Sequence, residues 1–238
     1  MARRLLATQG PARRIVALAG APGSGKSTLA ASLLAHLEAA RPGLAAMLAM
    51  DGYHLDDGLL EQRGQRARKG APHTYDVDGL AAMLARLRAD DGCEVVVPVF
   101  DRRLEIARAG AAVIAGTVRL VIVEGNWLLL DEPPWRALRP LFDATVMLDV
   151  PRDVLAARLL QRWRDLGLSD EAARRKVEAN DLPNADLVIT HSAPADLTVA
   201  GANALTKLPA TDPALPVRRR TAPRAAQRPP PGPGGSER

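Results

Sequence analysis

Nine residues near the N-terminus, Gly20–Thr28, limit what this chain can fold into more than any other stretch. They read GAPGSGKST and match the spacing G-x-x-x-x-G-K-[ST] at every fixed position. The residues before them, Arg14–Ala19, form a short apolar run typical of a buried parallel strand. After them, leucines recur at helical spacing and predict an amphipathic helix that begins at Lys26. A strand, a glycine-rich loop and a helix in this order are typical of a loop that binds phosphate.

The residue types of this Walker A loop explain how it would bind a nucleotide. Its glycines allow the backbone to adopt positive φ and to approach a ligand closely. The backbone N–H groups, aided by the positive end of the helix, then surround anionic oxygens. The Lys26 ammonium can reach the β- and γ-phosphates, and the Ser27 hydroxyl can complete a Mg²⁺ coordination shell. The predicted nucleotide-binding residues are Gly20, Ala21, Pro22, Gly23, Ser24, Gly25, Lys26, Ser27 and Thr28.

Length and charge favour one domain followed by a tail. Of the 238 residues, 13–200 suit a single α/β domain, with residues 1–12 as a lead-in. Residues 201–238 hold eight prolines and four glycines, a composition that builds no core, so we expect a disordered tail. The tail also holds seven basic residues against two acidic ones and accounts for the whole net charge of +5. Residues 1–200 therefore carry no net charge, which argues against a nucleic-acid-binding domain.

Cysteine content and hydropathy favour a soluble, cytoplasmic protein. Cys93 is the only cysteine, which excludes an internal disulfide framework and suits a reducing compartment. No apolar run reaches the roughly 18 residues of a membrane span, and the first residues lead into no signal-peptide hydrophobic region. We therefore expect no membrane insertion.

Apolar runs in the body alternate with helical patterns. The strands expected after the first lie at 44–50, 94–100, 118–123 and 144–148, with shorter ones at 111–115 and 187–190. Helices are expected near 80–87, 134–141, 152–166 and 169–180. Residues 52–75 show no period and predict a long functional loop. The alternation predicts an α/β P-loop NTPase fold, a parallel sheet of about five strands flanked by helices on both faces.

Acidic residues end four predicted strands, at the edge where a parallel sheet binds its ligand. Glu124 follows a Val-Ile-Val run in the Walker B position, where a carboxylate can hold Mg²⁺ through water. Asp51 can accept the proton of an attacking hydroxyl, and Asp101 with Arg102 can position a substrate. Each acid could instead cap a following helix, and Asp149 is more typical of a structural turn.

Basic residues outside the loop have two interpretations. Arg158 and Arg162 share a helix face at i, i+4, so they can clamp the transferring phosphoryl group or lie on a solvated face. The charge run at 66–69 is either solvated or neutralises a substrate phosphate. His54 and His73 lie in the long loop without a second ligand at metal-binding spacing, so no zinc site is predicted.

Missing motifs narrow the reaction class. The guanine motif N-K-x-D of GTPases does not occur, and helicase and transport ATPases need further motifs. A small Walker A domain with an acid-bearing loop after its second strand fits a small-molecule kinase best. Two alternatives stay open: a nucleotide-binding regulatory module without phosphotransfer, and a nucleic-acid-interacting ATPase that uses the basic tail. Deletion of residues 201–238 would leave the rate of a kinase unchanged but would weaken such an ATPase.

Five motifs, in this order, carry a resemblance to a known superfamily. They are the Walker A loop, MDGYH at 50–54, RKGAPHTYD at 68–76, PVFDR at 98–102 and VEGNW at 123–127. Together they resemble the uridine kinase, phosphoribulokinase and type I pantothenate kinase superfamily. Residues 124–130 and 180–186 are similar to its bacterial nucleoside/nucleotide kinase-like branch, whose members are often labelled pantothenate kinase-like or fructose transport system kinase.

The resemblance implies roles for individual residues. The implied catalytic residues are Lys26, Asp51 as the base, Glu124, and the lid arginines Arg158 and Arg162. Ser27 and Glu124 would place the metal, and Asn180 and Asn184 would lie near the base of ATP. Candidates for the acceptor pocket are Asp51, Tyr53, His54, His73, Tyr75, Asp101, Arg102 and Asn126. Relatives are often homodimers.

These observations lead to one functional prediction. We expect an ATP- and Mg²⁺-dependent kinase that phosphorylates a hydroxyl group of a small metabolite. The acceptor stays open among sugars, nucleosides and pantothenate-like alcohols.

Overall fold

A computed structural model describes residues 12–200 of the chain. The predicted lead-in, apart from Ala12, and the predicted disordered tail lie outside the described residues. Within this range, no helix combines the length and the apolar character needed to cross a bilayer.

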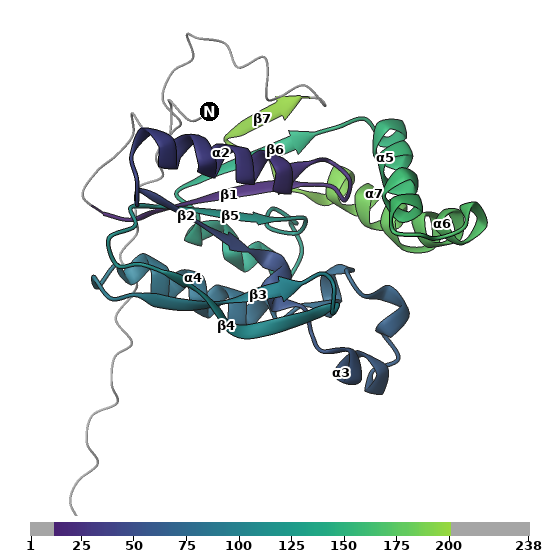
Figure 1. Ribbon diagram of the computed structural model, residues 1–238, viewed down its shortest axis with the longest axis horizontal. Helices are drawn as coiled ribbons and strands as arrows, with labels where there is room; N and C mark the ends of the chain where they lie inside the picture. The colour runs from purple at the N-terminus through teal and green to yellow at the C-terminus, as the bar shows by residue number, and fades with distance from the viewer. Residues whose placement is uncertain (1–11, 201–238) are drawn as a thin grey trace, which may run out of the picture.

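The centre of the molecule is a five-stranded parallel sheet (Figure 1). Its strands, in spatial order, are β2 (Ala45–Ala49), β5 (Leu120–Gly125), β1 (Arg14–Gly20), β6 (Ala144–Asp149) and β7 (Leu197–Ala200). Every neighbouring pair is parallel. The arrowheads of β5 and β6 point toward the end of the molecule where α5, α6 and α7 project (Figure 1). The predicted α/β P-loop NTPase fold is confirmed.

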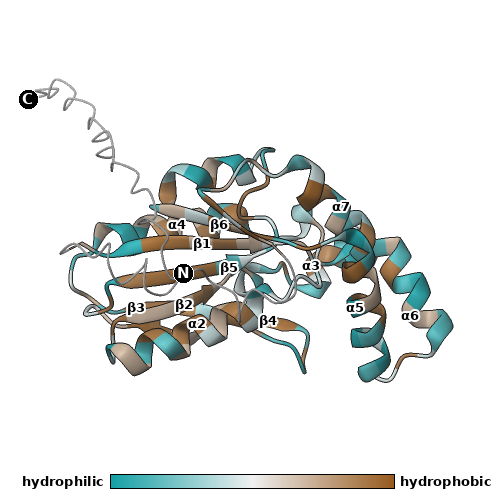
Figure 2. Cartoon of the chain, turned by 90° about the horizontal axis from the view of Figure 1, so that it is seen from above, coloured by the Kyte–Doolittle hydropathy of each residue, from teal (hydrophilic) through white to brown (hydrophobic). Residues whose placement is uncertain are grey.

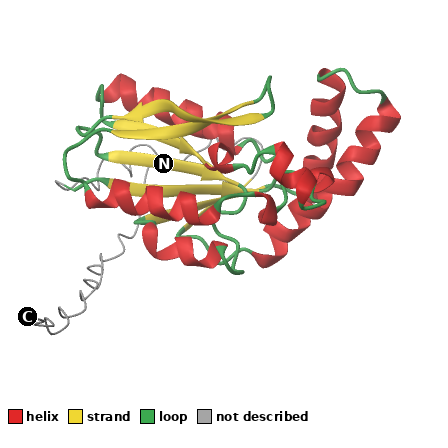
Figure 3. Cartoon of the chain, turned by 90° about the horizontal axis from the view of Figure 1, so that it is seen from below, coloured by secondary structure: helices red, strands yellow, loops and turns green. Residues whose placement is uncertain are grey.

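Two hydrophobic layers cover the sheet and explain why its strands are apolar throughout. On one face, Val16 and Leu18 of β1 pack with the leucines of helix α2 (Lys26–Ala40). On the other, the alternate residues Ile15 and Ala17 pack with helix α4 (Val77–Ala89). Helices therefore lie on both sides of the strands in Figure 3. A strand buried on both faces needs a continuous apolar run rather than an alternating one.

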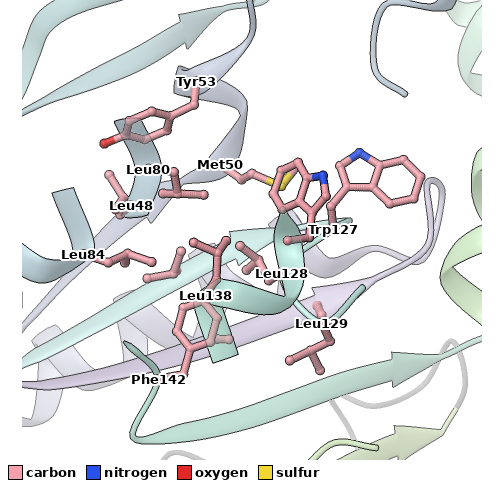
Figure 4. Packing of buried hydrophobic residues seen from close by; sticks show 14 of the residues in the cluster. Leu48, Met50, Tyr53, Leu80, Leu84, Trp127, Leu128, Leu129, Leu138 and Phe142 are labelled. Atoms are coloured by element: carbon pink, nitrogen blue, oxygen red, sulfur yellow. The ribbon is translucent and has the colours of Figure 1, made fainter. Parts of the chain in front are cut away.

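The α4 face holds the larger side chains. Figure 4 shows Met50, Trp127 and Leu128 meeting Leu80 and Leu84 of α4 between the sheet and the helix. Trp127 lies two residues after the end of β5 and is fully buried. This layer therefore anchors the chain just beyond the strand ends where the predicted site residues lie.

A separate two-stranded sheet corrects one expectation about strand pairing. The valine-rich run near 94–100 is strand β3 (Val95–Asp101), but it pairs antiparallel with β4 (Ile106–Ile114) and not with the parallel sheet. The predicted edge strand at 111–115 is the end of β4. A hydrophobic run specifies a strand without specifying its partner, so the sequence left this pairing undetermined. The hairpin lies beside α4 below the main sheet in Figure 1.

Short helices replace the long loop expected after β2. They are the 3₁₀ turns Met50–Tyr53, Arg66–Arg68 and Pro72–Thr74 and the helix α3 (Asp57–Gln62). The segment expected as a helix at 134–141 is a 3₁₀ helix, Trp135–Leu141. All of these turns lie between or beside the strands that carry the predicted acids.

The helices near the C-terminus correct two further expectations. Helix α5 (Arg152–Asp165) is followed by α6 (Asp170–Lys176), a π-helical turn (Val177–Asp181) and α7 (Leu182–His191). The predicted strand at 187–190 is wrong, because those residues form the last turns of α7. Four apolar residues fit a strand or a buried helix face equally well. The last strand is β7, a short segment that no pattern indicated. Figure 2 shows α5 and α6 projecting beyond the sheet.

A buried arginine ties the start of β1 to the segment that precedes β5. The Arg13 side chain is fully buried. Its guanidinium donates to the carbonyl oxygens of Leu87 (3.2 Å), Val118 (3.1 Å) and Gly116 (3.3 Å). Its Nη2 lies 3.6 Å from a carboxylate oxygen of Asp90. The charge is thus solvated by backbone carbonyls, as a buried cation requires.

Candidate functional site

The Walker A loop has the backbone geometry that its glycines predict. Gly23 and Gly25 adopt φ of +80° and +88°, a conformation that other residues rarely take. The Ser24 N–H donates to the Ala21 carbonyl at 3.0 Å, which closes the turn. Helix α2 then begins at Lys26 without a side-chain cap. The uncapped N–H groups of its first turn are available to an anion.

A cavity of about 580 Å³ opens in front of this loop at the carboxyl edge of the sheet. It is lined by residues of the loop, of the segment after β2, of the β3–β4 turn and of α5–α7. The predicted site residues that line it are Pro22, Gly23, Gly25, Lys26, Ser27, Thr28, Asp51, His54, Tyr75, Arg102, Asn126, Arg158, Arg162, Asn180 and Asn184. The cavity therefore collects side chains from nearly the whole length of the domain.

Lys26 and Ser27 line the cavity, and the carboxylates of Glu124 and Asp51 lie close enough to interact with the Lys26 ammonium. The Ser27 hydroxyl donates to Glu124 Oε2 at 3.1 Å. Burial lowers the pKa of the Lys26 ammonium, and the carboxylates of Glu124 and Asp51 partly offset that shift. Burial raises the pKa of Glu124, and the nearby Lys26 opposes this rise. Oxygen ligands beside a buried ammonium suit a divalent cation and a phosphate chain.

Asp51 also lines the cavity, between an arginine and a tyrosine. Arg102 Nη2 lies 2.6 Å from Asp51 Oδ2, and the Tyr75 hydroxyl lies 3.5 Å from Oδ1. The His54 Nδ1 lies 2.8 Å from the Asp51 carbonyl, and its ring packs against those of Tyr75 (4.1 Å) and Phe100 (4.6 Å). Burial lowers the pKa of His54 and raises that of the Tyr75 phenol. This wall combines a carboxylate with flat apolar surfaces.

Helix α5 places two of its four arginines, Arg158 and Arg162, at the cavity beside the loop. Arg158 Nη1 lies 3.4 Å from the Gly23 carbonyl oxygen and 3.3 Å from that of Ser24. The Arg162 guanidinium lies 5.6 Å from the Trp163 ring. Both arginines line the cavity, so they can approach a phosphate bound by the loop.

Several predicted residues lie away from the cavity. Gly20, Ala21 and Ser24 form the base of the loop, and Glu124 lies beneath Ser27. Asp101 Oδ1 accepts from the N–H groups of Arg103 and Leu104 at 3.1 Å each, so it caps the β3–β4 turn. The Tyr53 ring is buried in the core (Figure 4), and His73 is exposed.

Several residues that line the cavity were not among the predicted site residues, and four of them have side chains that bear on the site. They are Phe100, Trp163, Lys176 and Asp181. The Trp163 Nε1 donates to Asp181 Oδ2 at 2.6 Å, and Lys176 Nζ lies 4.3 Å from the Trp163 ring. Trp163 could have been noticed in the sequence, because the chain has only three tryptophans and this one lies in the arginine-rich helix predicted at 152–166.

Comparisons with known proteins agree with this geometry. The profile of the Phosphoribulokinase / Uridine kinase family matches residues 15–199. The Escherichia coli (strain K12) protein YggC is 36% identical over 197 residues, which are 82% of this chain and 81% of YggC. A uridine kinase of Haemophilus influenzae (strain PittGG) is 32% identical over 64% of this chain and 69% of its own.

A solved structure is also similar. It is a Silicibacter sp. TM1040 protein described as a "putative fructose transport system kinase", which is 46% identical in sequence and superimposes with a TM-score of 0.77. The match covers 83% of this chain and 96% of that protein.

Proposed function

Because the chain belongs to the phosphoribulokinase/uridine kinase family, we propose that it transfers the γ-phosphate of ATP, with Mg²⁺, to a hydroxyl group of a small metabolite. Family membership makes it a P-loop kinase, and the proposal adds the cofactors and the alcohol acceptor. The observation that supports it best is that Lys26, Ser27 and Asp51 line one cavity in front of the Walker A loop, with Glu124 bonded to Ser27 next to it.

The donor set fits Mg²⁺. Ser27 and Glu124 offer a hydroxyl and a carboxylate oxygen 3.1 Å apart beside the phosphate loop. Mg²⁺ prefers one or two protein oxygens together with water and substrate phosphates. Consistent with such an open site, the described residues contain no cluster of three or more acidic, histidine or cysteine ligands. When bound, the ion would neutralise charge on the phosphate oxygens.

The loop and the arginines stabilise charge on the phosphates. The N–H groups at the start of α2 and the Lys26 ammonium face the cavity and would hold the β- and γ-phosphates. Arg158 and Arg162 would approach the transferring group from the α5 side. The loop backbone that carries the amide donors is fixed before the reaction, which is the condition for effective electrostatic stabilisation.

Asp51 would orient and deprotonate the acceptor hydroxyl. Asp51 lines the same cavity as Lys26, and Arg102 and Tyr75 contact its two carboxylate oxygens. The acceptor would lie against the His54, Tyr75 and Phe100 rings and near the Asn126 amide. Sugars, nucleosides and pantothenate-like alcohols all present hydroxyl groups that suit such a wall.

Two further parts of the proposal rest on the sequence alone. The single cysteine suits a reducing cytoplasm, and the resemblance favours a homodimer. For the base of ATP the resemblance favours Asn180 and Asn184, and the contacts of these two amides are considered in the next subsection.

An ADP-release screen over sugars, nucleosides and vitamins tests the proposal. With MgATP we expect ADP release to rise with at least one acceptor and to be lost in Lys26→Ala. A regulatory module without phosphotransfer would bind MgATP, gain thermal stability and release no ADP with any acceptor. That outcome would replace the kinase proposal.

A further inference from the structure

The loop at residues 68–70 is held by side chains from the far end of the domain. Arg68 Nη1 donates to the Ala179 carbonyl at 2.5 Å, and its Nη2 donates to Asn184 Oδ1 at 3.1 Å. Asn180 Nδ2 donates to the Lys69 carbonyl at 3.1 Å. Asn184 Nδ2 lies 3.5 Å from Asn180 Oδ1 and joins the two contacts. We call Arg68, Asn180 and Asn184 the clasp.

The chemistry of arginine fixes the direction of every hydrogen bond in the clasp. A guanidinium only donates, so the atom of Asn184 that meets Arg68 must be its oxygen. The Asn184 amide nitrogen therefore faces Asn180 and requires an oxygen there. The Asn180 nitrogen is then left to donate to the Lys69 carbonyl. Only one arrangement of the two amides satisfies all three contacts, and it begins and ends on neighbouring residues of the loop.

A proline makes the helical side of the clasp available. In a regular helix the Ala179 carbonyl would accept from the N–H of the residue four positions later. That residue is Pro183, which has no N–H. The helix is π-helical at Val177–Asp181, and the Leu182 N–H bonds to the Val177 carbonyl instead. Arg68 therefore supplies a donor to a carbonyl that an α-helical bond cannot satisfy.

The other side of the same loop is fixed to the end of β5. Trp127 Nε1 donates to the Gly70 carbonyl at 3.1 Å. Trp127 is three residues after Glu124 and is fully buried, so it provides a rigid anchor. Successive carbonyls of the loop, at Lys69 and Gly70, thus bond to the α6–α7 region and to the Walker B strand.

We propose that the clasp is a positioning device that sets the acceptor half of the cavity against the π-helical turn and α7, which pack against α5, the helix of the phosphate-side arginines. The loop presents Lys69, whose ammonium lies 5.4 Å from the Phe100 ring and 2.6 Å from Asp57 Oδ1. The proposal rests on the kinase function proposed above. It also assigns Asn180 and Asn184 to positioning the loop and not to binding the base of ATP.

Amide hydrogen exchange of the full chain tests the clasp without any acceptor. In Arg68→Ala and in the isosteric Asn180→Asp, we expect exchange at residues 66–71 to accelerate by about fivefold or more, as the loss of one net hydrogen bond implies. The affinity for MgADP, measured by calorimetry, should change less than about twofold, because the clasp touches no loop amide of the nucleotide site. Arg68→Lys keeps the positive charge but loses the two-armed guanidinium. Its exchange at residues 66–71 should therefore lie between that of the unmodified protein and that of Arg68→Ala.

A matched control and two contrary outcomes complete the test. Arg152→Ala removes an arginine that bonds to Asp186 on α7 outside the cavity, and it should leave exchange at residues 66–71 unchanged. If Asn180→Asp weakens MgADP binding and leaves that exchange unchanged, Asn180 binds the nucleotide and the proposal is wrong. If exchange at residues 66–71 in Arg68→Lys equals that of the unmodified protein, the proposal is also wrong, because a positive charge alone would then hold the loop.

The kinase proposal and the clasp can fail separately. If no acceptor is found, the exchange result still decides the clasp. If an acceptor is found, the clasp variants should raise its KM and leave the KM for ATP unchanged. An equal change in both KM values would point to general loosening and would overturn the positioning role.

Discussion

The role of Asp51 gives the sharpest test of the proposed chemistry. Asp51→Asn keeps the shape of the side chain and removes the proton acceptor. A positioned general base contributes about 10²–10⁴-fold to a rate, which is about 3–5.5 kcal/mol of transition-state stabilisation. We therefore expect turnover to fall by at least about 100-fold at saturating MgATP and acceptor.

The structure predicts a much smaller effect of this substitution on stability. The substitution removes the ion pair between residue 51 and Arg102, whose side chain is 56% exposed. Exposed pairs contribute about 0–1 kcal/mol, so the unfolding midpoint should move by no more than about 2–4 °C. MgADP binding, measured by calorimetry, should persist, because Lys26, Ser27 and the loop amides are untouched.

The comparison with a control decides the result. Asp153→Asn changes an exposed aspartate in the first turn of α5 and should leave turnover unchanged. Turnover of Asp51→Asn equal to that of the unmodified protein would refute the base assignment. A loss of turnover matched by an equal loss of MgADP affinity would refute it as well, since the residue would then serve binding.

Three further predictions concern the loop, the metal site and the core. Gly23→Ala places a Cβ 3.0 Å from Leu159 Cγ at a φ of +80°, so strain of about 1–2 kcal/mol should weaken MgADP binding roughly tenfold in calorimetry. Burial raises the pKa of Glu124, so protons should compete with Mg²⁺ for this carboxylate at a higher pH than they would for an ordinary glutamate. The apparent Mg²⁺ affinity, measured by titrating activity, should therefore fall as the pH is lowered from neutral. An affinity that stays constant over that range would contradict the prediction. Arg13→Ala leaves several buried carbonyls without their donor, while Asp90 keeps Arg119, and it should lower the free energy of unfolding in urea by about 3–5 kcal/mol; a loss below about 1 kcal/mol would show that water replaces the guanidinium.

The parts of the fold that local sequence determines were predictable. The Walker A loop, β1 and α2 follow from glycine spacing and apolar periodicity, because their conformation depends on residues that are neighbours in the chain. Pairing depends on distant residues. The β3 run fits a parallel strand as well as a hairpin strand, and the 187–190 segment fits a strand as well as the end of α7. Local pattern could not separate these possibilities.

The candidate site divides in the same way. The motifs indicated Lys26, Asp51 and Glu124. In the structure Lys26 and Asp51 line one cavity, and Glu124 lies next to it, bonded to Ser27. The contacts of Arg68 were not predictable, because its partners are more than a hundred residues away in the chain. In sequence it belongs to a charge run, and nothing local distinguishes it from its exposed neighbour Arg66. Asp101 shows the reverse case, since a strand-end acid can cap a turn as readily as it can face a ligand.

The placement of the β3–β4 hairpin has a consequence for how acceptor preference can change. The hairpin, α3 and the short turns all lie in one continuous stretch between β2 and β5, roughly residues 50–118, whereas the phosphate-binding loop and α5 lie outside it. If the proposed function is correct, this single cassette of consecutive residues carries most of the acceptor wall. Exchanging that cassette with the matching stretch of a relative should transplant substrate choice and leave nucleotide use intact, provided the graft retains the carbonyls that surround Arg13.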